Sequence, residues 1–248
     1  MASNVKYERH MPTEFKYIEA LPFFSDKETV NLFLDYFKER LLPAEDFFMG
    51  YKCAMMQVET RFKSLNEQFS LDERRNPIET IKSRLKSPES IIRKACQKDL
   101  DKSLEAVAVN IFDIAGVRVI CSFEQDIYRL ADCFLSQEDI KLLEKKDYIT
   151  HPKDNGYRSL HLIVSIPVYM AYGRRDVTVE VQLRTMAMDF WASLEHKLRY
   201  KQRLSEDEMK LIEEELYECA SISASLDRRM QEVANQLNHT GSTRYINV

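Results

Sequence analysis

Glycine and proline are scarce in this sequence, with 5 glycines and 7 prolines among 248 residues. A turn-rich all-β fold needs many of both, so their scarcity argues against that class and favours long helices. No stretch of about 20 apolar residues that could span a bilayer is present. The N-terminal segment carries charged residues without an apolar run, so we expect no secretory signal.

The 5 cysteines are scattered, odd in number and never spaced as CxxC. The pattern therefore indicates neither a disulfide framework nor a thiolate zinc site, and reduced thiols in a cytoplasmic protein fit it better. The content of 44% hydrophobic and 31% charged residues is typical of a soluble protein with an ample core. With a net charge of −4, highly charged partners must be bound by local patches, and non-specific nucleic-acid binding is not expected.

One segment, Asp176–Thr185, has the alternation of a strand with two unlike faces. Valine and leucine occupy one face, whereas Thr178, Glu180, Gln182 and Arg184 share the other, because side chains alternate along a strand. The apolar face predicts a buried side. The opposite face carries an acid, an amide and a guanidinium, which is more chemistry than a merely hydrated sheet requires.

Two further segments repeat this arrangement. In Gly116–Cys121, apolar residues oppose Arg118, and Asp113 lies just upstream. Later in the chain, Tyr157 and His161 fall on one side of a predicted strand. Any one such face is typical of a solvated surface, but three together favour one polar cleft on a sheet.

The periodicities predict an α+β fold, with a central mixed sheet of about five strands flanked by helices. A run of helices comes first, and the short helix beginning at Asn76-Pro77 would have Ile78, Ile81 and Leu85 as its apolar stripe. Another helix begins with Ser87 as N-cap and Pro88 at its first position. We expect helices at 25–41, 45–69, 125–136, 186–201 and 205–237, strands near 116–123, 140–148, 157–167 and 176–184, a hairpin turn at 172–175, and a tail without periodicity at 241–248.

A basic segment precedes and enters the helix at Pro88. Lys82, Arg84 and Lys86 are followed by Ser90 and Lys94, which lie one turn apart on that helix. A helix N-terminus offers free amide donors and the positive end of its dipole, so the segment predicts a polyphosphate cradle. Surface helices often carry such charges, and a solvated face is the alternative.

Of two acids, Asp113 lies just before one predicted strand and Glu180 lies in the centre of another. A pair of carboxylates can hold Mg²⁺ and leave other positions to water and phosphates. Glu180 can also accept a proton from an attacking hydroxyl. The alternative for each acid is an arginine partner on a neighbouring strand. In the third polar segment, Tyr157 can stack on a base and Lys153 can meet its phosphates, although a lone Tyr-His pair such as Tyr157 and His161 is more often a packing pair.

Taken in order, five motifs resemble those of the small alarmone synthetases, the single-domain relatives of the RelA/SpoT synthetase domain. They are Ser83–Lys86, Asp113–Arg118, Gly156–His161, Glu180–Thr185 and Phe190–His196. The resemblance implies a nucleotidyltransferase-like sheet and transfer of pyrophosphate from ATP to the 3′-hydroxyl of GDP or GTP, which releases AMP and (p)ppGpp. It also implies Mg²⁺ as cofactor and a homotetrameric assembly.

The same resemblance implies a role for each matching residue. Asp113 and Glu180 would be catalytic and bind Mg²⁺, and Glu180 would activate the 3′-hydroxyl. Arg84 and Arg118 would sandwich the adenine. Relatives carry an arginine one turn after Lys94, where this chain has Gln97. The implied ATP site is Arg84, Lys86, Ser90, Lys94 and Arg118, and the implied GDP or GTP site is Lys153, Tyr157, His161, Gln182 and Asp189.

The implied organisation is a helical extension at 1–74, a catalytic core at 75–201, a C-terminal helix at 202–240 and a tail at 241–248. No His-Asp dipeptide typical of the hydrolase domain of longer relatives occurs, so synthesis without degradation is expected. Two other functions stay open at this stage. A catalytically silent nucleotide-binding regulator would keep the pocket without turnover, and a polymerase-like nucleotidyltransferase would release pyrophosphate instead of AMP.

Overall fold

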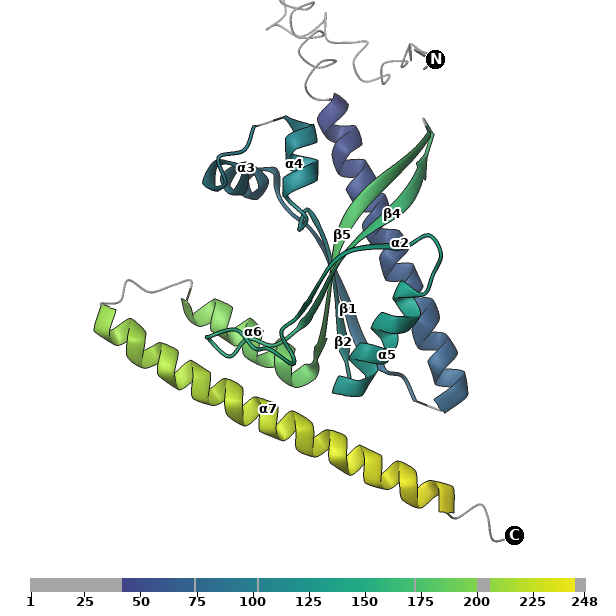
Figure 1. Cartoon of the computed structure of the whole chain (residues 1–248), viewed down its shortest axis with the longest axis vertical. Coiled ribbons are helices and arrows are strands. Elements are labelled where there is room, and N and C mark those ends of the chain that lie inside the picture. Colours follow the sequence, from purple (N-terminus) through teal and green to yellow (C-terminus); the bar gives the residue numbers. More distant parts are fainter. Residues whose placement is uncertain (1–41, 74, 102, 172, 200–205, 244–248) are drawn as a thin grey trace, which may run out of the picture. The chain divides into compact units, whose positions relative to one another are not determined.

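The structure, a computed structural model, describes residues 42–73, 75–101, 103–171, 173–199 and 206–243 (Figure 1). Within these residues, five strands form one mixed sheet in the order β1-β2-β5-β4-β3. Only β2 and β5 run parallel among its neighbouring strands. The α+β class is thereby confirmed. In chain order the elements are α2 (Leu42–Glu73), β1 (Ile78–Leu85), α3 (Pro88–Gln97), α4 (Leu104–Asn110), β2 (Ala115–Cys121), α5 (Glu124–Leu135), β3 (Lys141–Asp147), β4 (Leu160–Met170), β5 (Gly173–Thr185), α6 (Met186–Arg199) and α7 (Glu206–Thr243).

The prediction of a short helix after Asn76-Pro77 was wrong, because this segment is the edge strand β1. Ile78, Ile81 and Leu85 fit a helical spacing, but Ile81 pairs with Val119 in an antiparallel ladder with β2. Eight residues are too few for a stable helix without tertiary support. Pairing with an available sheet edge satisfies the same backbone groups and therefore decides the conformation.

Strands β4 and β5 form the predicted antiparallel hairpin, with Met170 paired to Gly173. Strand β5 begins at Gly173, inside the predicted turn, and Gly173 has a φ of +120° that favours glycine. Strand β4 begins at Leu160 instead of Tyr157. Tyr157 therefore lies in the segment leading into the strand, and the alternation of side-chain direction along a strand does not apply to it.

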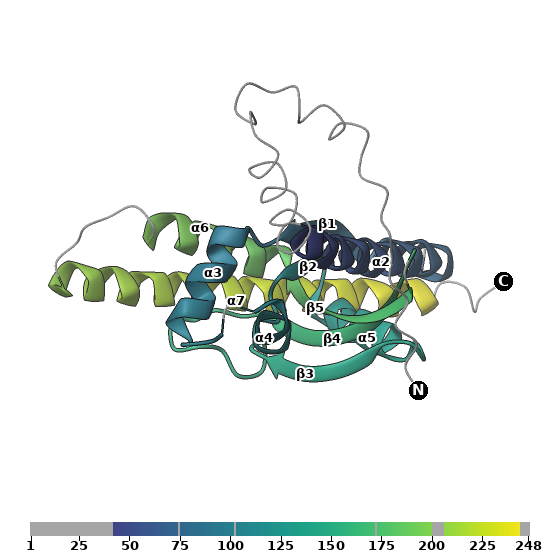
Figure 2. The same cartoon turned by 90° about the horizontal axis from the view of Figure 1, so that it is seen from above.

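The described residues from Met49 onward form one compact unit, in which α5 and the part of α2 that belongs to the unit cover one face of the sheet (Figures 1 and 2). The rings of Phe62 on α2 and Phe134 on α5 stack with centroids 4.5 Å apart and are fully buried. Val179 and Val181 of β5 are also fully buried, which confirms the apolar face predicted for this strand. Burial of this face is the main source of stability and leaves the polar face of β5 on the other side.

Two short helices follow β1. Helix α3 begins at Pro88 with the Ser87 hydroxyl accepting a hydrogen bond from the Ser90 amide at 3.4 Å, as predicted. Helix α4 was not predicted, and Ser103 caps it through the Ala106 amide at 3.2 Å. Its 7 residues are too few for a clear periodic signal.

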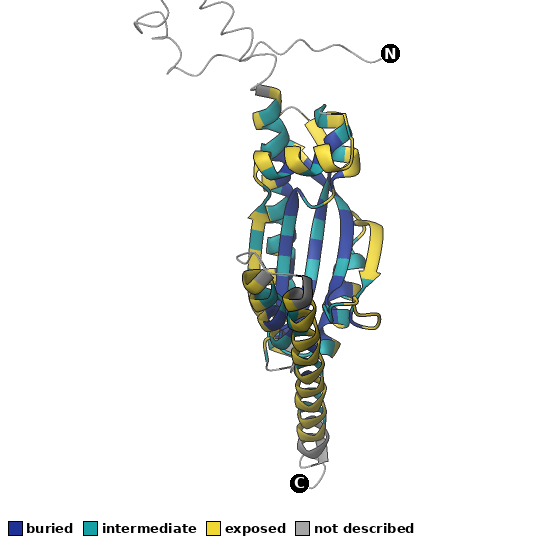
Figure 3. Cartoon of the chain, turned by 90° about the vertical axis from the view of Figure 1, so that its left-hand side faces the viewer, coloured by how far each residue is buried: buried dark blue, intermediate teal, exposed yellow. Residues whose placement is uncertain are grey.

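Helices α6 and α7 pack against each other at one end of the sheet (Figure 3). The Trp191 indole on α6 donates a hydrogen bond to the Leu216 carbonyl of α7 at 2.9 Å. Helix α7 continues to Thr243, so the first residues of the predicted tail are helical. The predicted helix 25–41, the first residue of the predicted helix 205–237 and residues 244–248 lie outside the described residues. The domain boundaries at 74/75, 201/202 and 240/241 stay a prediction, and no helix in the described ranges is long and apolar enough to cross a membrane.

Candidate active site

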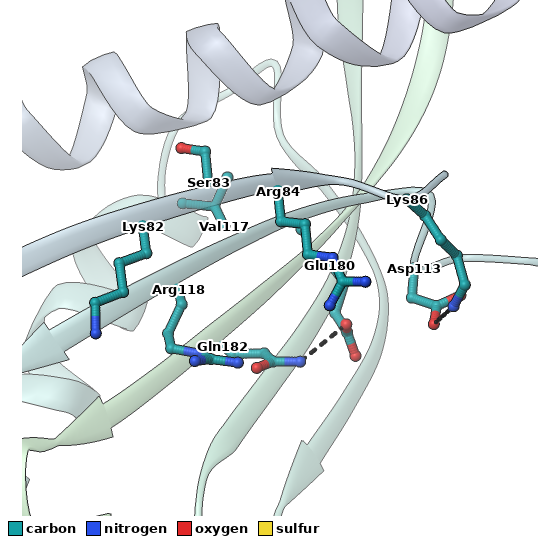
Figure 4. A pocket seen from close by; sticks show the side chains of 10 residues that line it. Lys82, Ser83, Arg84, Lys86, Asp113, Val117, Arg118, Glu180 and Gln182 are labelled. Carbon is teal, nitrogen blue, oxygen red and sulfur yellow. Dashed lines mark hydrogen bonds and ion pairs between the residues drawn. The ribbon is translucent and has the colours of Figure 1, made fainter. Parts of the chain in front are cut away.

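The polar face of the sheet holds a cavity of about 370 Å³ (Figure 4). It lies where β1, β2 and β5 are adjacent, on the face turned away from the valines of β5. The cavity is lined by Lys82, Ser83, Arg84, Lys86, Asp113, Gly116, Val117, Arg118, Glu180 and Gln182. The predicted polar cleft is therefore present, and strands distant in the sequence build it.

Strand pairing brings its side chains together in rows. Lys82 of β1 pairs with Arg118 of β2, which pairs with Gln182 of β5. Gln182 in turn pairs with His161 of β4. Residues paired across neighbouring strands point to the same face, so four side chains separated by up to 100 residues of sequence form one polar row.

The next row contains a glycine. Arg84 pairs with Gly116, and Gly116 pairs with Glu180. A side chain at 116 would point between Arg84 and Glu180, and its Cβ would lie 3.7 Å from the Arg84 carbonyl oxygen. Glycine at 116 thus leaves open the space beside the Glu180 carboxylate.

Glu180 is held by two side chains on its own face. His161 Nδ1 lies 3.1 Å from Glu180 Oε1, and the Gln182 amide donates to Oε2 at 3.0 Å. Burial raises the pKa of Glu180, but hydrogen bonding to His161 and Gln182 outweighs it, so the pKa lies below its ordinary value. Glu180 is therefore an ionised acceptor at neutral pH, and His161 must donate from Nδ1.

Asp113 is paired with two lysines. Lys86, the residue after β1, has its Nζ 2.6 Å from Asp113 Oδ2, and Lys94 Nζ, on α3, lies 2.8 Å from Oδ1. Burial raises the pKa of Asp113, but the two lysines more than offset it and the pKa is lowered. The arginine partner considered from the sequence is replaced by lysines, the groups expected to bind phosphates.

The two carboxylates are suited to a divalent cation. Asp113 and Glu180 line the same cavity, and the charge of Asp113 raises the pKa of Glu180, so the groups are electrostatically coupled. Within the described part of the chain, no cluster of three or more His, Cys, Asp or Glu forms a metal centre. Two carboxylates with remaining positions for water and phosphates match the preference of Mg²⁺.

Next to Glu180, side chains close a hydrogen-bonded ring. The Tyr157 hydroxyl lies 2.9 Å from His161 Nε2 and accepts a hydrogen bond from Arg184 Nη2. Arg184 also donates to Gln182 Oε1 at 3.1 Å. In a neutral imidazole, donation from Nδ1 would leave Nε2 to accept the Tyr157 proton. The ring joins Tyr157 to Glu180 through side chains alone.

Asp189, on the first turn of α6, joins three cationic side chains. Its Oδ2 accepts from Lys82 at 3.0 Å, and its Oδ1 lies 3.3 Å from Arg118 and 3.4 Å from Arg184. Burial and the charge of Arg184 together lower the pKa of Arg118, with Asp189 opposing them. The sequence placed Lys82 in the predicted polyphosphate cradle and Arg184 on the polar face of β5, but it predicted no contact of either residue with Asp189.

Of the remaining predicted residues, Arg84 lines the cavity, whereas Ser90 and Lys153 lie outside its lining. Arg84 is exposed and makes no ion pair with any described residue. The Ser90 hydroxyl is paired with Ser87 at 3.1 Å on α3 and does not line the cavity. Lys153 Nζ lies over two rings, 4.9 Å from the centroid of Tyr157 and 4.7 Å from that of Tyr148. Tyr157, His161 and Asp189 thus reach the cavity through the hydrogen-bonded and ion-paired network, and Lys153 contacts that network through the Tyr157 ring.

Comparison with known proteins matches residues 83–205 to the region found in RelA/SpoT proteins, which includes every cavity-lining residue except Lys82. The chain is 44% identical over 188 residues to the GTP pyrophosphokinase YwaC of Bacillus subtilis, a match covering 76% of this chain and 89% of that protein. It is 31% identical over 194 residues to the GTP pyrophosphokinase YjbM of the same organism, covering 78% and 89%.

Solved structures give the same relationship. The small alarmone synthetase 2 of Bacillus subtilis is similar with a TM-score of 0.68 at 40% identity, covering 77% of this chain and 98% of that one. The small alarmone synthetase 1 of that organism, bound to its product pppGpp, is similar with a TM-score of 0.69 at 31% identity, covering 78% and 97%.

Proposed function

Since this chain belongs to the RelA/SpoT family of (p)ppGpp synthetases, we propose that its cavity is where the pyrophosphate of ATP passes to the 3′-hydroxyl of GDP or GTP. The enzyme is a GTP diphosphokinase. One observation carries the assignment of the site: Asp113 and Glu180 face a single cavity together with Arg84, Lys86 and Arg118. An ionised base beside cations is what hydroxyl attack on a phosphate needs.

The donor occupies the β1, β2 and α3 side of the cavity. Arg84 and Arg118 hold the adenine between planar guanidinium groups, which suits stacking. Lys86 and Lys94, already paired with Asp113, meet the phosphates. Ser90 lies in the first turn of α3, where free amides favour an anion.

The acceptor lies on the β4, β5 and α6 side. Tyr157 stacks on the guanine, with Lys153 at the phosphates and His161, Gln182 and Asp189 lining the site. The 3′-oxygen attacks the β-phosphorus of ATP, the bond from that phosphorus to the α-phosphate oxygen breaks, and AMP leaves. Glu180 takes the proton of the 3′-hydroxyl. Asp113 and Glu180 would hold Mg²⁺, which neutralises phosphate charge when bound.

Incubation with ATP, GDP or GTP and Mg²⁺, followed by separation of the nucleotides, tests this function. We expect AMP and (p)ppGpp in equal amounts. A silent regulator would bind nucleotides without releasing AMP, and a polymerase-like enzyme would release pyrophosphate. Retention of both carboxylates favours the synthetase over the silent regulator. The cytoplasmic location and the absence of (p)ppGpp hydrolysis stay predictions.

Replacing Tyr157 by alanine should weaken acceptor use more than ATP binding. Loss of ring stacking is expected to raise the KM for GTP about tenfold or more. Binding of a non-hydrolysable ATP analogue should change about twofold at most, because Tyr157 does not line the donor side. Tyr157→Phe is the matched control, since it keeps the ring and removes only the hydroxyl bonded to Arg184 and His161. Equal losses for the two nucleotides would contradict the assignment.

We also propose that the enzyme is a homo-oligomer, a homotetramer by analogy with its family. Helix α7 carries an exposed apolar stripe at helical spacing, and burial of such a surface drives association. Its members are Ile222, Leu226, Met230, Val233 and Leu237, each 49–67% exposed. Leu226→Glu places a charge in the stripe and should lower the mass measured by light scattering. An unchanged mass would show that the stripe is not the interface.

A further inference from the structure

Helix α7 carries a buried acid outside the cavity. The Asp227 side chain is 8% exposed, and its Oδ2 accepts a hydrogen bond from the Thr185 hydroxyl at 2.6 Å. The same oxygen lies 3.9 Å from Arg158 Nη1. Water does not reach these buried groups, so the carboxylate, the hydroxyl and the guanidinium must satisfy one another's charge and hydrogen bonds. Asp227 therefore restricts the positions of Thr185 and Arg158.

Both partners of Asp227 are adjacent in the sequence to residues of the hydrogen-bonded ring beside Glu180. Arg158 directly follows Tyr157, and Thr185 directly follows Arg184. Arg184 and Tyr157 are themselves hydrogen-bonded. Asp227 therefore holds two separate backbone segments, the entry to β4 and the end of β5, whose adjoining side chains meet in the hydrogen-bonded ring beside Glu180.

The contact between Arg158 and Asp227 helps to compensate the buried charge of the guanidinium. Its side chain is 11% exposed, and Nη2 donates to Glu124 at 2.7 Å. Its Nη1 is buried and has no hydrogen-bond partner among the described residues. Asp227 is the second carboxylate that faces this guanidinium, so its removal would leave Arg158 with Glu124 alone.

A second contact between α7 and the same loop is independent of charge. Gly156, with a φ of +83°, packs so closely that a Cβ there would lie 2.5 Å from the Ala220 Cβ. Ala220 and Asp227 are 7 residues apart, which places them two turns apart on the same face of α7. That face also binds α6, where the Ser223 hydroxyl donates to the Ala187 carbonyl at 3.3 Å.

We propose that Asp227 is a positioning residue for the acceptor site, acting through Arg158 and Thr185 to set the places of Tyr157 and Arg184. Helix α7 then contributes to synthesis, since it positions Tyr157, which stacks on the guanine, relative to the general base Glu180. This inference rests on the proposed assignment of Tyr157 to the acceptor. It predicts that loss of Asp227 acts on GTP and leaves the ATP side, built by β1, β2 and α3, intact.

The test compares Asp227→Ala and Asp227→Asn with Glu232→Gln, an exposed acid on the opposite face of α7. We expect Asp227→Ala to raise the KM for GTP about tenfold, the scale of a lost hydrogen bond to a charged group. The dissociation constant of a non-hydrolysable ATP analogue should stay within about twofold of the unmodified enzyme. The amide oxygen of Asp227→Asn still accepts the Thr185 hydrogen bond, so the KM of this variant for GTP should lie between those of Asp227→Ala and the unmodified enzyme.

A merely structural role gives a different result. If Asp227→Ala lowers the melting temperature and weakens both nucleotides equally, or leaves the KM for GTP unchanged, the proposal is overturned. Should Asp227→Ala fail to fold, Asp227→Asn decides, and no shift of the KM for GTP relative to ATP binding would reject it. Failure of the unmodified enzyme to release AMP would instead reject the proposed function.

Discussion

Replacing Glu180 by glutamine is expected to reduce AMP release by about 10²–10⁴-fold, the range of general acid–base catalysis. Glutamine has nearly the same shape but cannot take the proton of the 3′-hydroxyl. The lowered pKa of Glu180, in which hydrogen bonding to His161 and Gln182 outweighs burial, keeps the group ready as a base at neutral pH. Single-turnover measurement of AMP formation at saturating ATP and GTP checks this directly.

The control for Glu180→Gln is Glu144→Gln. Glu144 pairs with Ile163, which pairs with Glu180, so it occupies the same row of the sheet two strands away. It is ion-paired with Lys146 at 3.0 Å and does not line the cavity. We expect Glu144→Gln to keep full activity, and both variants to melt within a few degrees of the unmodified enzyme, about the effect of one surface interaction. Unchanged AMP release by Glu180→Gln would refute its role as the base.

Asp113→Asn should lower synthesis by about 10²-fold or more, because it removes one of the two carboxylates proposed to hold the cation. It also leaves Lys86 and Lys94 without the charge that now orients both ammonium groups. A titration of Mg²⁺ against initial rate should show a higher Mg²⁺ requirement for this variant. Asp132→Asn, at an exposed position of α5, is the matched control and should behave like the unmodified enzyme. An unaltered rate and Mg²⁺ requirement in Asp113→Asn would contradict the role.

The lowered pKa of Asp113 adds a dependence on pH. Burial raises this pKa, yet the bonds from Lys86 and Lys94 bring it below its unfolded value. The carboxylate therefore stabilises the fold above the unfolded pKa, and this contribution is lost as the pH falls through the folded pKa. The difference in melting temperature between Asp113→Asn and the unmodified enzyme should accordingly shrink in acid.

Much of the site was predictable from β5 alone. Alternation of small apolar and polar residues puts Glu180, Gln182 and Arg184 on one face, and the burial of Val179 and Val181 agrees with it. The same reasoning failed for β1, since an apolar spacing in 8 residues is compatible with a helix and with an edge strand. The place of Lys82 beside Arg118 and Asp189 consequently became known only when β1 was paired with β2.

Local sequence determined which side chains share a strand face, where α3 begins and which residue types offer bases, cations and stacking rings, because these depend on near neighbours along the chain. The tertiary structure alone decided which of them meet. The pairing of Asp113 with Lys86 and Lys94, the three cations around Asp189, and the hold of Asp227 on Thr185 all join elements that no local pattern relates. Strand order and helix packing supply that information, since contacts across a sheet depend on burial of the whole core and not on the residues beside them.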